Sequence, residues 1–358
     1  PGYSAGLPVE PHVELVAASA RLRHLSRVCR EVADMAAGAG PQHAERVFTA
    51  AAEKLHGAFS ESDRSGPVTM TTALRAVRDL AQERHDRPRT IVGTPTGFRD
   101  LDALVLGLRR GTMHVLGARP AMGKTAMALA IAVNVAMSGC GVIYVTTEVP
   151  HMQIGLRAVS LLSGTNSEAI ETGTATSDQW GQIAHAFTRL GPHAGAFVVG
   201  DRTRADLAYV RRLVRRYKRT ERRELGLVVV DHMHQMGTPR AASREREVAE
   251  LSLGLLDIAT SENVPLLALC QLSRQCEARP NKRPCMADLR DSGSVEQDAG
   301  LVALLYRHEH YQPDDEESRG IAELYVAKNR QGRTGTVKLR YDRTCGRFQD
   351  LTRRYDER

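Results

Sequence analysis

The sequence predicts an α/β fold in which a mostly parallel sheet is covered by helices. From about residue 90 onward, short apolar runs alternate with helical patterns, which is typical of parallel strands joined by crossover helices. The first of these runs leads through a loop of small residues into an alanine-rich helix. A chain of 358 residues is also long enough to bury a large core.

The individual elements follow from the apolar patterns. The predicted strands cover 112–118, 141–148, 195–201, 225–232, 264–271, 300–307, 321–328 and 336–342. The predicted helices between them cover 124–137, 150–163, 204–219 and 244–262. Because no helical pattern separates the last runs, we expect those strands to pair locally.

The region before the sheet is predicted to be helical. Apolar residues recur at helical spacing in two runs within 13–59, which indicates a small hairpin of helices. The stretch 60–70 has the composition of a linker, and 71–87 then forms an isolated helix whose apolar stripe is narrow. That stripe either lies on the helix's own domain or docks onto another subunit.

These boundaries divide the chain into three parts. Residues 1–60 hold a partial N-terminal helical hairpin, 61–89 a linker with the docking helix, and 90–358 the α/β domain.

Composition excludes several classes of protein. The net charge of +7 permits a polyanionic partner such as nucleic acid. Aromatic residues are only 4% of the chain, with Trp180 the single tryptophan, so a binder built on stacked aromatic platforms is not expected. The 6 cysteines form no C-x-x-C pair, which indicates reduced thiols rather than a disulfide framework or a structural zinc site. No apolar run approaches about 18 residues, so we expect a cytoplasmic protein without a membrane partner.

The stretch GARPAMGKT, residues 117–125, almost matches the phosphate-binding pattern G-x-x-x-x-G-K-[ST]. Ala118 stands where the first glycine is expected. The alternative, a chance match in an alanine-rich chain, is disfavoured because the stretch follows a strand and opens a helix. Lys124 is predicted to reach the β- and γ-phosphates of ATP, and the hydroxyl of Thr125 to bind Mg²⁺. The residues predicted to bind nucleotide are Ala118, Arg119, Pro120, Ala121, Met122, Gly123, Lys124, Thr125 and Ala126.

Polar residues end three other apolar runs. Asp231 follows four apolar residues and is predicted to be a metal ligand, although an aspartate starting a loop has the same pattern. Glu148 is the candidate general base, the alternative being a carboxylate at a helix start. Gln271 suits a sensor of the γ-phosphate. Because the carboxyl ends of parallel strands meet at one edge, these residues are expected near the phosphate loop. His232 and His234 suggest zinc only weakly, since no further ligand lies at a useful spacing.

Two basic segments carry different interpretations. The arginine-dense stretch 202–224 has apolar residues on one face, which favours a solvated helix surface. The loop 288–300 exposes Arg290 among small residues, so its backbone N–H groups and this arginine are suited to a phosphate chain.

In this order the motifs resemble those of the bacterial replicative DNA helicases, the DnaB-like hexameric family. The similarity covers roughly 90–352, and that family's phosphate loop commonly begins with alanine, as this one does at 118. The stretches that carry the resemblance are GFRDLDALVLGL, ARPAMGKT, TEVP, VVVDHMHQM, LCQLSR, KRPCMADLRDSGSVEQDAG and AKNRQGRTGTVKLRYD.

The resemblance implies a RecA-like P-loop ATPase domain in a homo-hexamer that hydrolyses ATP between subunits. Lys124 and Thr125 match the Walker A residues, Asp231 the Walker B acid, Glu148 the water-activating glutamate and Gln271 the sensor. Lys328 and Arg330 match the basic pair supplied by the neighbouring subunit, with Arg330 as the arginine finger. The alternative for this pair is an ordinary turn between two strands.

The resemblance also implies partners. Single-stranded DNA would follow loops matching Arg244 and the segment Arg290, Asp291, Ser292 and Gly293, and forked DNA would be unwound 5′ to 3′. The helix 71–87 matches the linker helix that docks on the adjacent subunit. Residues 13–59 match only the last helical hairpin of the family's N-terminal domain. A primase and a helicase loader are further partners that the family implies.

Two other functions compete with a helicase. The first is a RecA-like ATPase that binds or remodels single-stranded DNA without unwinding it, and the second is a nucleotide-gated loader that scarcely hydrolyses ATP. The linker helix and the pair Lys328 and Arg330 favour the ring helicase over the first. Glu148 argues against the second.

Overall fold

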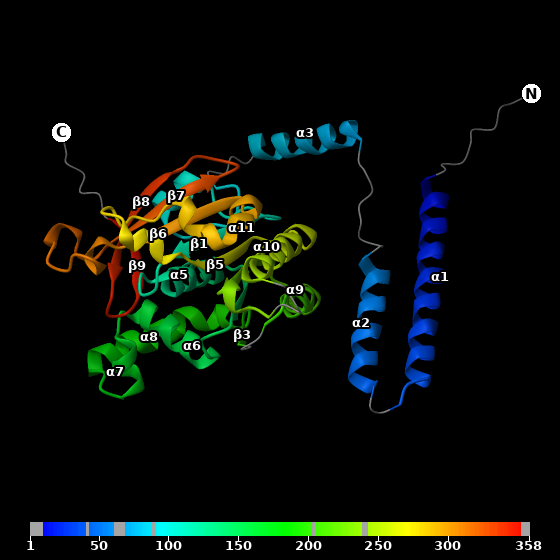
Figure 1. The fold of residues 1–358 in the computed structure, drawn as a ribbon, viewed down its shortest axis with the longest axis horizontal. Coiled ribbons are helices and arrows are strands. Elements are labelled where there is room, and N and C mark those ends of the chain that lie inside the picture. Colours follow the sequence, from blue (N-terminus) through cyan, green and yellow to red (C-terminus); the bar gives the residue numbers. More distant parts are fainter. Residues whose placement is uncertain are drawn as a thin grey trace, which may run out of the picture. The chain divides into compact units, whose positions relative to one another are not determined.

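The computed structural model describes residues 10–40, 43–60, 69–86, 91–201, 205–237 and 243–351. The chain divides into two compact units, 1–88 and 89–358 (Figure 1). Residues 61–68 of the predicted linker 60–70 lie outside the described residues, as do residues 87–90. No helix of the described ranges has the length and apolar character needed to cross a membrane.

The second unit is built on one sheet whose strand order is β3-β2-β4-β5-β1-β6-β7-β8-β9. Its strands are β1 (Met113–Ala118), β2 (Gly141–Thr146), β3 (Phe197–Asp201), β4 (Leu225–Asp231), β5 (Leu266–Gln271), β6 (Leu301–Tyr306), β7 (Ile321–Asn329), β8 (Gly335–Asp342) and β9 (Arg347–Asp350). Its helices are α4 (Arg99–Val105), α5 (Lys124–Met137), α6 (His151–Ser163), α7 (Ser167–Glu171), α8 (Ser177–Ala194), α9 (Leu207–Thr220), α10 (Arg244–Ser261) and α11 (Gly293–Asp298).

The pairing confirms the predicted α/β class. Strands β3, β2, β4, β5, β1 and β6 run parallel, whereas β6 to β9 pair as antiparallel neighbours. The expected local pairing of the last strands is therefore correct. The short strand β9 is absent from the sequence-based prediction because its four residues, RFQD, include a single apolar residue and so show no strand pattern.

Both faces of the parallel strands are buried, which explains their continuous apolar runs. Along β4, Leu227 and Val229 pack into one core, and Val228 and Val230 pack into the other. Helices α5 and α6 contribute to the first core, and α9 and α10 contribute to the second.

Four helices of this unit, α4, α7, α8 and α11, were not predicted, and the longest of them, α8, shows one reason. Its sequence contains Gly181, Gly191 and Pro192, which lower its apparent helical propensity. The local signal that could have revealed it is a capping box, in which Thr176 and Gln179 exchange hydrogen bonds at the helix start.

The first unit contains α1 (Glu10–Ala37), α2 (Ala44–Ser60) and α3 (Met70–Asp86). Helices α1 and α2 pack against one another. In α3, the side chains of Leu74, Val77 and Leu80 remain 61%, 60% and 50% exposed. The predicted apolar stripe is therefore unburied within this single chain.

Candidate functional site

The loop 119–123 joins β1 to α5 at the carboxyl edge of the sheet. Its backbone is tightly folded, because Ala121 has φ 64° and Gly123 has φ 96°. At Gly123 a Cβ atom would also stand 3.2 Å from the Phe348 ring, so this position needs glycine for both its dihedral angle and its space. The loop opens directly onto Lys124, the first residue of α5.

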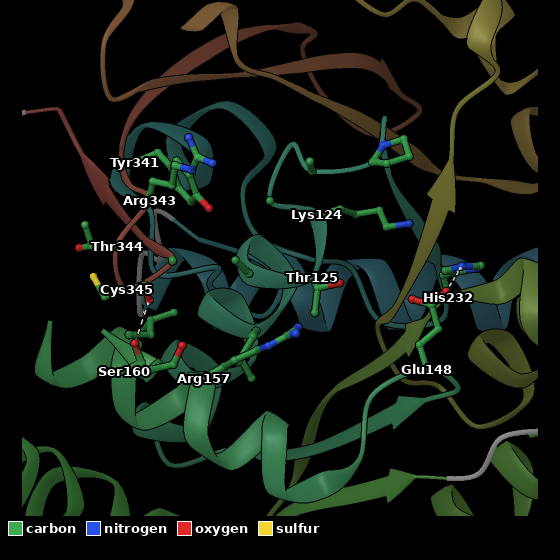
Figure 2. Close-up of a pocket in the computed structure, with 18 of the residues that line it drawn as sticks. Lys124, Thr125, Glu148, Arg157, Ser160, His232, Tyr341, Arg343, Thr344 and Cys345 are labelled. Carbon is green, nitrogen blue, oxygen red and sulfur yellow. Dashed lines mark hydrogen bonds and ion pairs between the residues drawn. The ribbon is translucent and has the colours of Figure 1, made fainter. Parts of the chain in front are cut away.

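A cavity of about 600 Å³ lies beside this loop (Figure 2). Of the residues predicted to bind nucleotide, Arg119, Pro120, Ala121, Gly123, Lys124, Thr125 and Ala126 line it. Ala118 and Met122 instead have side chains that are 1% exposed and belong to the core beneath the loop. Their contribution to the cavity is the shape of the backbone.

Lys124 is the central cation of the cavity. Burial lowers the pKa of its ammonium group, and the negative charges of Asp231 and Glu148 act in the opposite direction. Among the described residues its Nζ atom makes no hydrogen bond or ion pair. An ammonium group that lines a cavity and has no acceptor among the described residues is suited to bind a phosphate oxygen.

The other strand tips converge on the same edge, as the sequence predicted. Gln271 ends β5, is paired with Ala118 of β1, and lines the cavity. Glu148 follows the end of β2 and also lines it. Asp231 ends β4 but is only 3% exposed, and its Oδ2 atom accepts a hydrogen bond of 2.9 Å from the hydroxyl of Tyr144. Burial and the charge of Asp231 raise the pKa of Tyr144, which keeps this hydroxyl a donor.

Glu148 lies opposite Thr125 across the cavity in Figure 2. Its Oε1 atom accepts hydrogen bonds from His232 Nε2, at 3.0 Å, and from Gln235 Nε2. His232 is 6% exposed, and burial together with the charge of Lys124 lowers its pKa. Its ring contacts a carboxylate, and no cluster of three or more potential metal-ligating side chains occurs in the described ranges.

Two arginines stabilise the phosphate loop, Arg119 from within the motif and Arg307 from outside it. The guanidinium group of Arg119 donates to both carboxylate oxygens of Glu277 and to the Leu272 carbonyl, which occupies its donors within the protein. Arg307 donates to the Ala121 carbonyl at 3.3 Å. Arg119 therefore lines the cavity as a structural residue of the loop.

Sequence reasoning missed the far wall of the cavity. It is formed by residues of α6, the first residue of α7, the end of β8 and the turn between β8 and β9, and Figure 2 shows those that it labels on the other side of the cavity from Glu148. These residues are Arg157, Ser160, Leu161, Ser167, Tyr341, Arg343, Thr344, Cys345 and Gly346. The turn lies far from the phosphate loop in the sequence, so only Gly346, with φ 67°, offered a local signal of a tight turn.

Arg157 is the missed residue with the clearest chemistry. Its guanidinium group extends from α6 toward Thr125 in Figure 2 and lines the cavity. No hydrogen bond or ion pair involves its side chain within the described ranges. An arginine so placed is suited to bind phosphate oxygens.

The cavity lies at the carboxyl ends of the parallel strands, which we call the carboxyl edge of the sheet. Lys328 and Arg330 lie at the amino ends of these strands, the amino edge. The amide of Arg330 donates to the Gly300 carbonyl at 2.8 Å, and the Gly300 amide donates to the carbonyl of Met113, where β1 begins. The phosphate loop follows Ala118, at the other end of β1. One strand length, about 17 Å, therefore separates the two sites.

The basic pair is held by a helix end. Lys328 Nζ donates to the Glu296 carbonyl at 2.5 Å, and Arg330 Nη2 donates to the Gln297 carbonyl. Both carbonyls belong to the last turn of α11, where positive charge is favourable. Burial and the neighbouring charge of Arg330 lower the pKa of Lys328.

The segment predicted to contact DNA leads into that helix. Its backbone runs through a 3₁₀ segment, Met286–Ser292, to Gly293 at the start of α11. Arg244 begins α10 after the N-cap Ser243. The side chains of Arg244, Arg290, Asp291 and Ser292 lie outside what the structure describes.

Comparison with known proteins agrees with this architecture. Residues 93–350 match the family model of the DnaB-like helicase C terminal domain. The replicative DNA helicase DnaB of Geobacillus stearothermophilus is 38% identical over 78% of this chain, which spans 61% of that relative's length.

Two solved structures are similar in fold. The ATPase domain of G40P has a TM-score of 0.75 and 30% identity, covering 80% of this chain and 100% of that one. A DnaB-like replicative helicase, solved in a study of its interactions with primase, has a TM-score of 0.80 and 27% identity, covering 97% and 80%. The fold, the ordered motifs and the family match together establish that the chain belongs to the DnaB-like helicase C-terminal domain family.

Proposed function

We propose that this chain is an ATP-dependent replicative DNA helicase that works as a hexameric ring in the cytoplasm. It moves 5′ to 3′ on single-stranded DNA, unwinds duplex DNA at forks, and uses ATP with Mg²⁺. Membership of the DnaB-like family and the names of the relatives as replicative helicases support the proposal.

The cavity beside the phosphate loop fits a nucleoside triphosphate. Lys124 brings to the cavity an ammonium group that has no partner among the described residues, and the loop backbone at Ala121 and Gly123 is folded as a phosphate cradle requires. Thr125 and Asp231 would hold Mg²⁺, the hydroxyl directly and the carboxylate from the tip of β4. When bound, Mg²⁺ neutralises charge on the phosphate oxygens.

The residues around the phosphates then have distinct roles. Glu148 takes a proton from the attacking water, and Gln271 senses the terminal phosphate from the tip of β5. Arg157 adds positive charge on the side of α6, where negative charge grows during transfer.

One observation supports the assembly of several copies into one ATPase: the cavity and Arg330 are at opposite edges of the same sheet. An arginine side chain cannot cross about 17 Å, so Arg330 cannot act on the nucleotide bound by its own chain. We infer that Arg330 and Lys328 reach the cavity of a neighbouring copy, with Arg330 as the arginine finger.

The same edge suggests how DNA is coupled to hydrolysis. The proposed DNA segment, Arg290 to Gly293, continues into α11, and the end of α11 holds Lys328 and Arg330 through its carbonyls. A shift of the DNA segment would therefore move the basic pair. Arg244, at the start of α10, is a second proposed DNA contact.

The remaining parts of the chain are proposed to contact neighbouring subunits and partner proteins. We propose three domains: the partial hairpin 1–60, the linker with its docking helix 61–89, and the ATPase domain 90–358. The exposed stripe of α3 docks on the adjacent subunit. Contacts with a primase and a helicase loader are also proposed, the first because a similar helicase was studied with primase.

The test is unwinding of forked DNA that carries one single-stranded tail at a time, combined with native mass measurement. We expect hexamers that unwind only the fork with a 5′ tail and require ATP. DNA-stimulated ATP hydrolysis without unwinding of either fork would instead support a RecA-like protein that remodels single-stranded DNA. ATP binding without turnover would support a nucleotide-gated loader.

A further inference from the structure

The carboxylate of Glu148 is held by two donors from one short segment. His232 Nε2 and Gln235 Nε2 both donate to the Oε1 atom of Glu148. His232 directly follows β4, and Gln235 closes the 3₁₀ turn Met233–Gln235 after it. Because this inference concerns the proposed base, it rests on the proposed ATP hydrolysis.

The hydrogen-bonding pattern defines both donors. A carboxylate only accepts hydrogen bonds, so the proton of the His232 ring lies on Nε2, and Nδ1 has no partner within the described ranges. The side-chain oxygen of Gln235 accepts from the hydroxyl of Thr147 at 3.4 Å. This contact directs the amide nitrogen of Gln235 toward Glu148.

The backbone around the contact is fixed as well. The amide of Thr147 donates to the Asp231 carbonyl at 2.9 Å, and the single hydroxyl proton of Thr147 is shared between that carbonyl, at 3.3 Å, and the Gln235 side-chain oxygen, at 3.4 Å. The tip of β2 is thereby joined to the tip of β4. Glu148 follows the end of β2, and its two donors follow the end of β4. The two strand ends are hydrogen-bonded to each other.

We propose that His232 and Gln235 are positioning residues that restrain the Glu148 carboxylate for reaction. Glu148 is 45% exposed, so without these donors its side chain would sample several rotamers. With one oxygen bound, the other oxygen points into the cavity on the side of Thr125, as Figure 2 shows. That oxygen is the one that faces a water attacking the terminal phosphate, and correct orientation of a base contributes to rate.

The effect expected of such residues is specific. His232 lines the cavity, but its Nε2 donor and that of Gln235 are bound to Glu148, so we expect both residues to act on turnover more than on nucleotide affinity. Removing a group that orients a reacting side chain lowers activity by about 10- to 100-fold.

The test compares the full chain with His232→Phe and Gln235→Met, which keep side-chain size but remove the donors. We expect kcat for ATP hydrolysis to fall about 10-fold in each variant and about 100-fold in the double variant, with KM within about twofold. His232→Gln, which restores an N–H donor, should recover most of the loss. His185→Phe and Gln182→Met, at exposed positions of α8, are matched controls that should leave kcat unchanged.

A second arm separates positioning from general damage. In a Glu148→Gln background, His232→Phe should cause no further loss, because the carboxylate through which it acts is gone. Unchanged kcat in His232→Phe and Gln235→Met would overturn the inference. So would a further loss in the Glu148→Gln background, or equal kcat for His232→Gln and His232→Phe. Absence of ATP hydrolysis by the unaltered chain would instead overturn the proposed function.

Discussion

The two edges of the central sheet differ in what they present to solvent. The carboxyl edge gathers Lys124, Glu148 and Gln271 around one cavity, whose lining also includes other residues at or just after the ends of β1, β2, β4 and β5 and residues of α6. The amino edge carries Lys328 and Arg330, which are bound to the end of α11. Each edge holds part of the proposed ATPase machinery, so under the proposed function a complete site requires two copies of the chain.

The largest expected effect tests the carboxyl edge. Lys124→Ala removes the ammonium group that lines the cavity and should abolish nucleotide binding, and with it ATP hydrolysis. Turnover and nucleotide binding would be measured on the full chain, with the exposed Lys338→Ala as the matched control. Full DNA-stimulated ATP hydrolysis by the Lys124→Ala variant would show that this cavity is not the ATP site.

The next effect tests the amino edge. Arg330→Ala should leave nucleotide binding intact and lower hydrolysis by about 1,000-fold, because an arginine finger stabilises charge only in the transition state. The exposed Arg333→Ala on the following turn is the control.

Mixing variants then tests whether the two edges meet between copies. Arg330→Ala subunits keep an intact cavity, and Glu148→Ala subunits keep an intact finger. Mixed assemblies should recover part of the turnover that neither variant shows alone. No recovery, in assemblies shown by native mass to be mixed, would contradict action between subunits.

A smaller effect concerns the oligomeric state, which we expect to depend on α3. Replacing Leu74, Val77 and Leu80 by serine removes the exposed apolar stripe of α3 and should shift the native mass from hexamer to monomer. Replacing Arg75, Arg78 and Gln82, which lie off this stripe, by serine as well should leave the assembly unchanged. Unchanged hexamers after loss of the stripe would show that α3 does not dock on a neighbour.

The smallest effect is a pH dependence of stability at the amino edge. His114 of β1 is fully buried, accepts from the Arg109 amide at Nε2 (3.0 Å), and contacts the Leu266 carbonyl through Nδ1 (3.3 Å). Burial lowers its pKa from 6.5 to about 4, so the folded state binds this proton less readily than the unfolded state. Stability is therefore complete above pH 6.5 and is lost progressively as the pH falls toward 4.

At pH 5 the contribution of His114 corresponds to about 2 kcal/mol of lost stability. Urea unfolding of the full chain at pH 7 and pH 5 measures it, with His114→Gln expected to reduce the difference between the two values. An equal difference in both proteins would show that other groups dominate the acid sensitivity.

Several parts of this fold could be read from the sequence because local physics dictates them. Continuous apolar runs such as 227–230 reveal strands buried on both faces, and the loop before Lys124 has the composition that a phosphate cradle requires. The converging strand tips followed from parallel topology alone, which brings Glu148 and Gln271 to one edge. The roles of these residues remain predictions.

The far wall of the cavity could not be read in this way. Arg157 and the turn after β8 reach the site only through packing of segments far apart in the chain, and their local sequence resembles any helix or hairpin. The contact of His232 and Gln235 with Glu148 likewise depends on two strands lying side by side. The sequence by itself determined which strands and loop form, since these depend on neighbouring residues. Only the tertiary structure decided which side chains share the cavity and that Arg330 lies a strand length away, because distances between remote segments are set by packing.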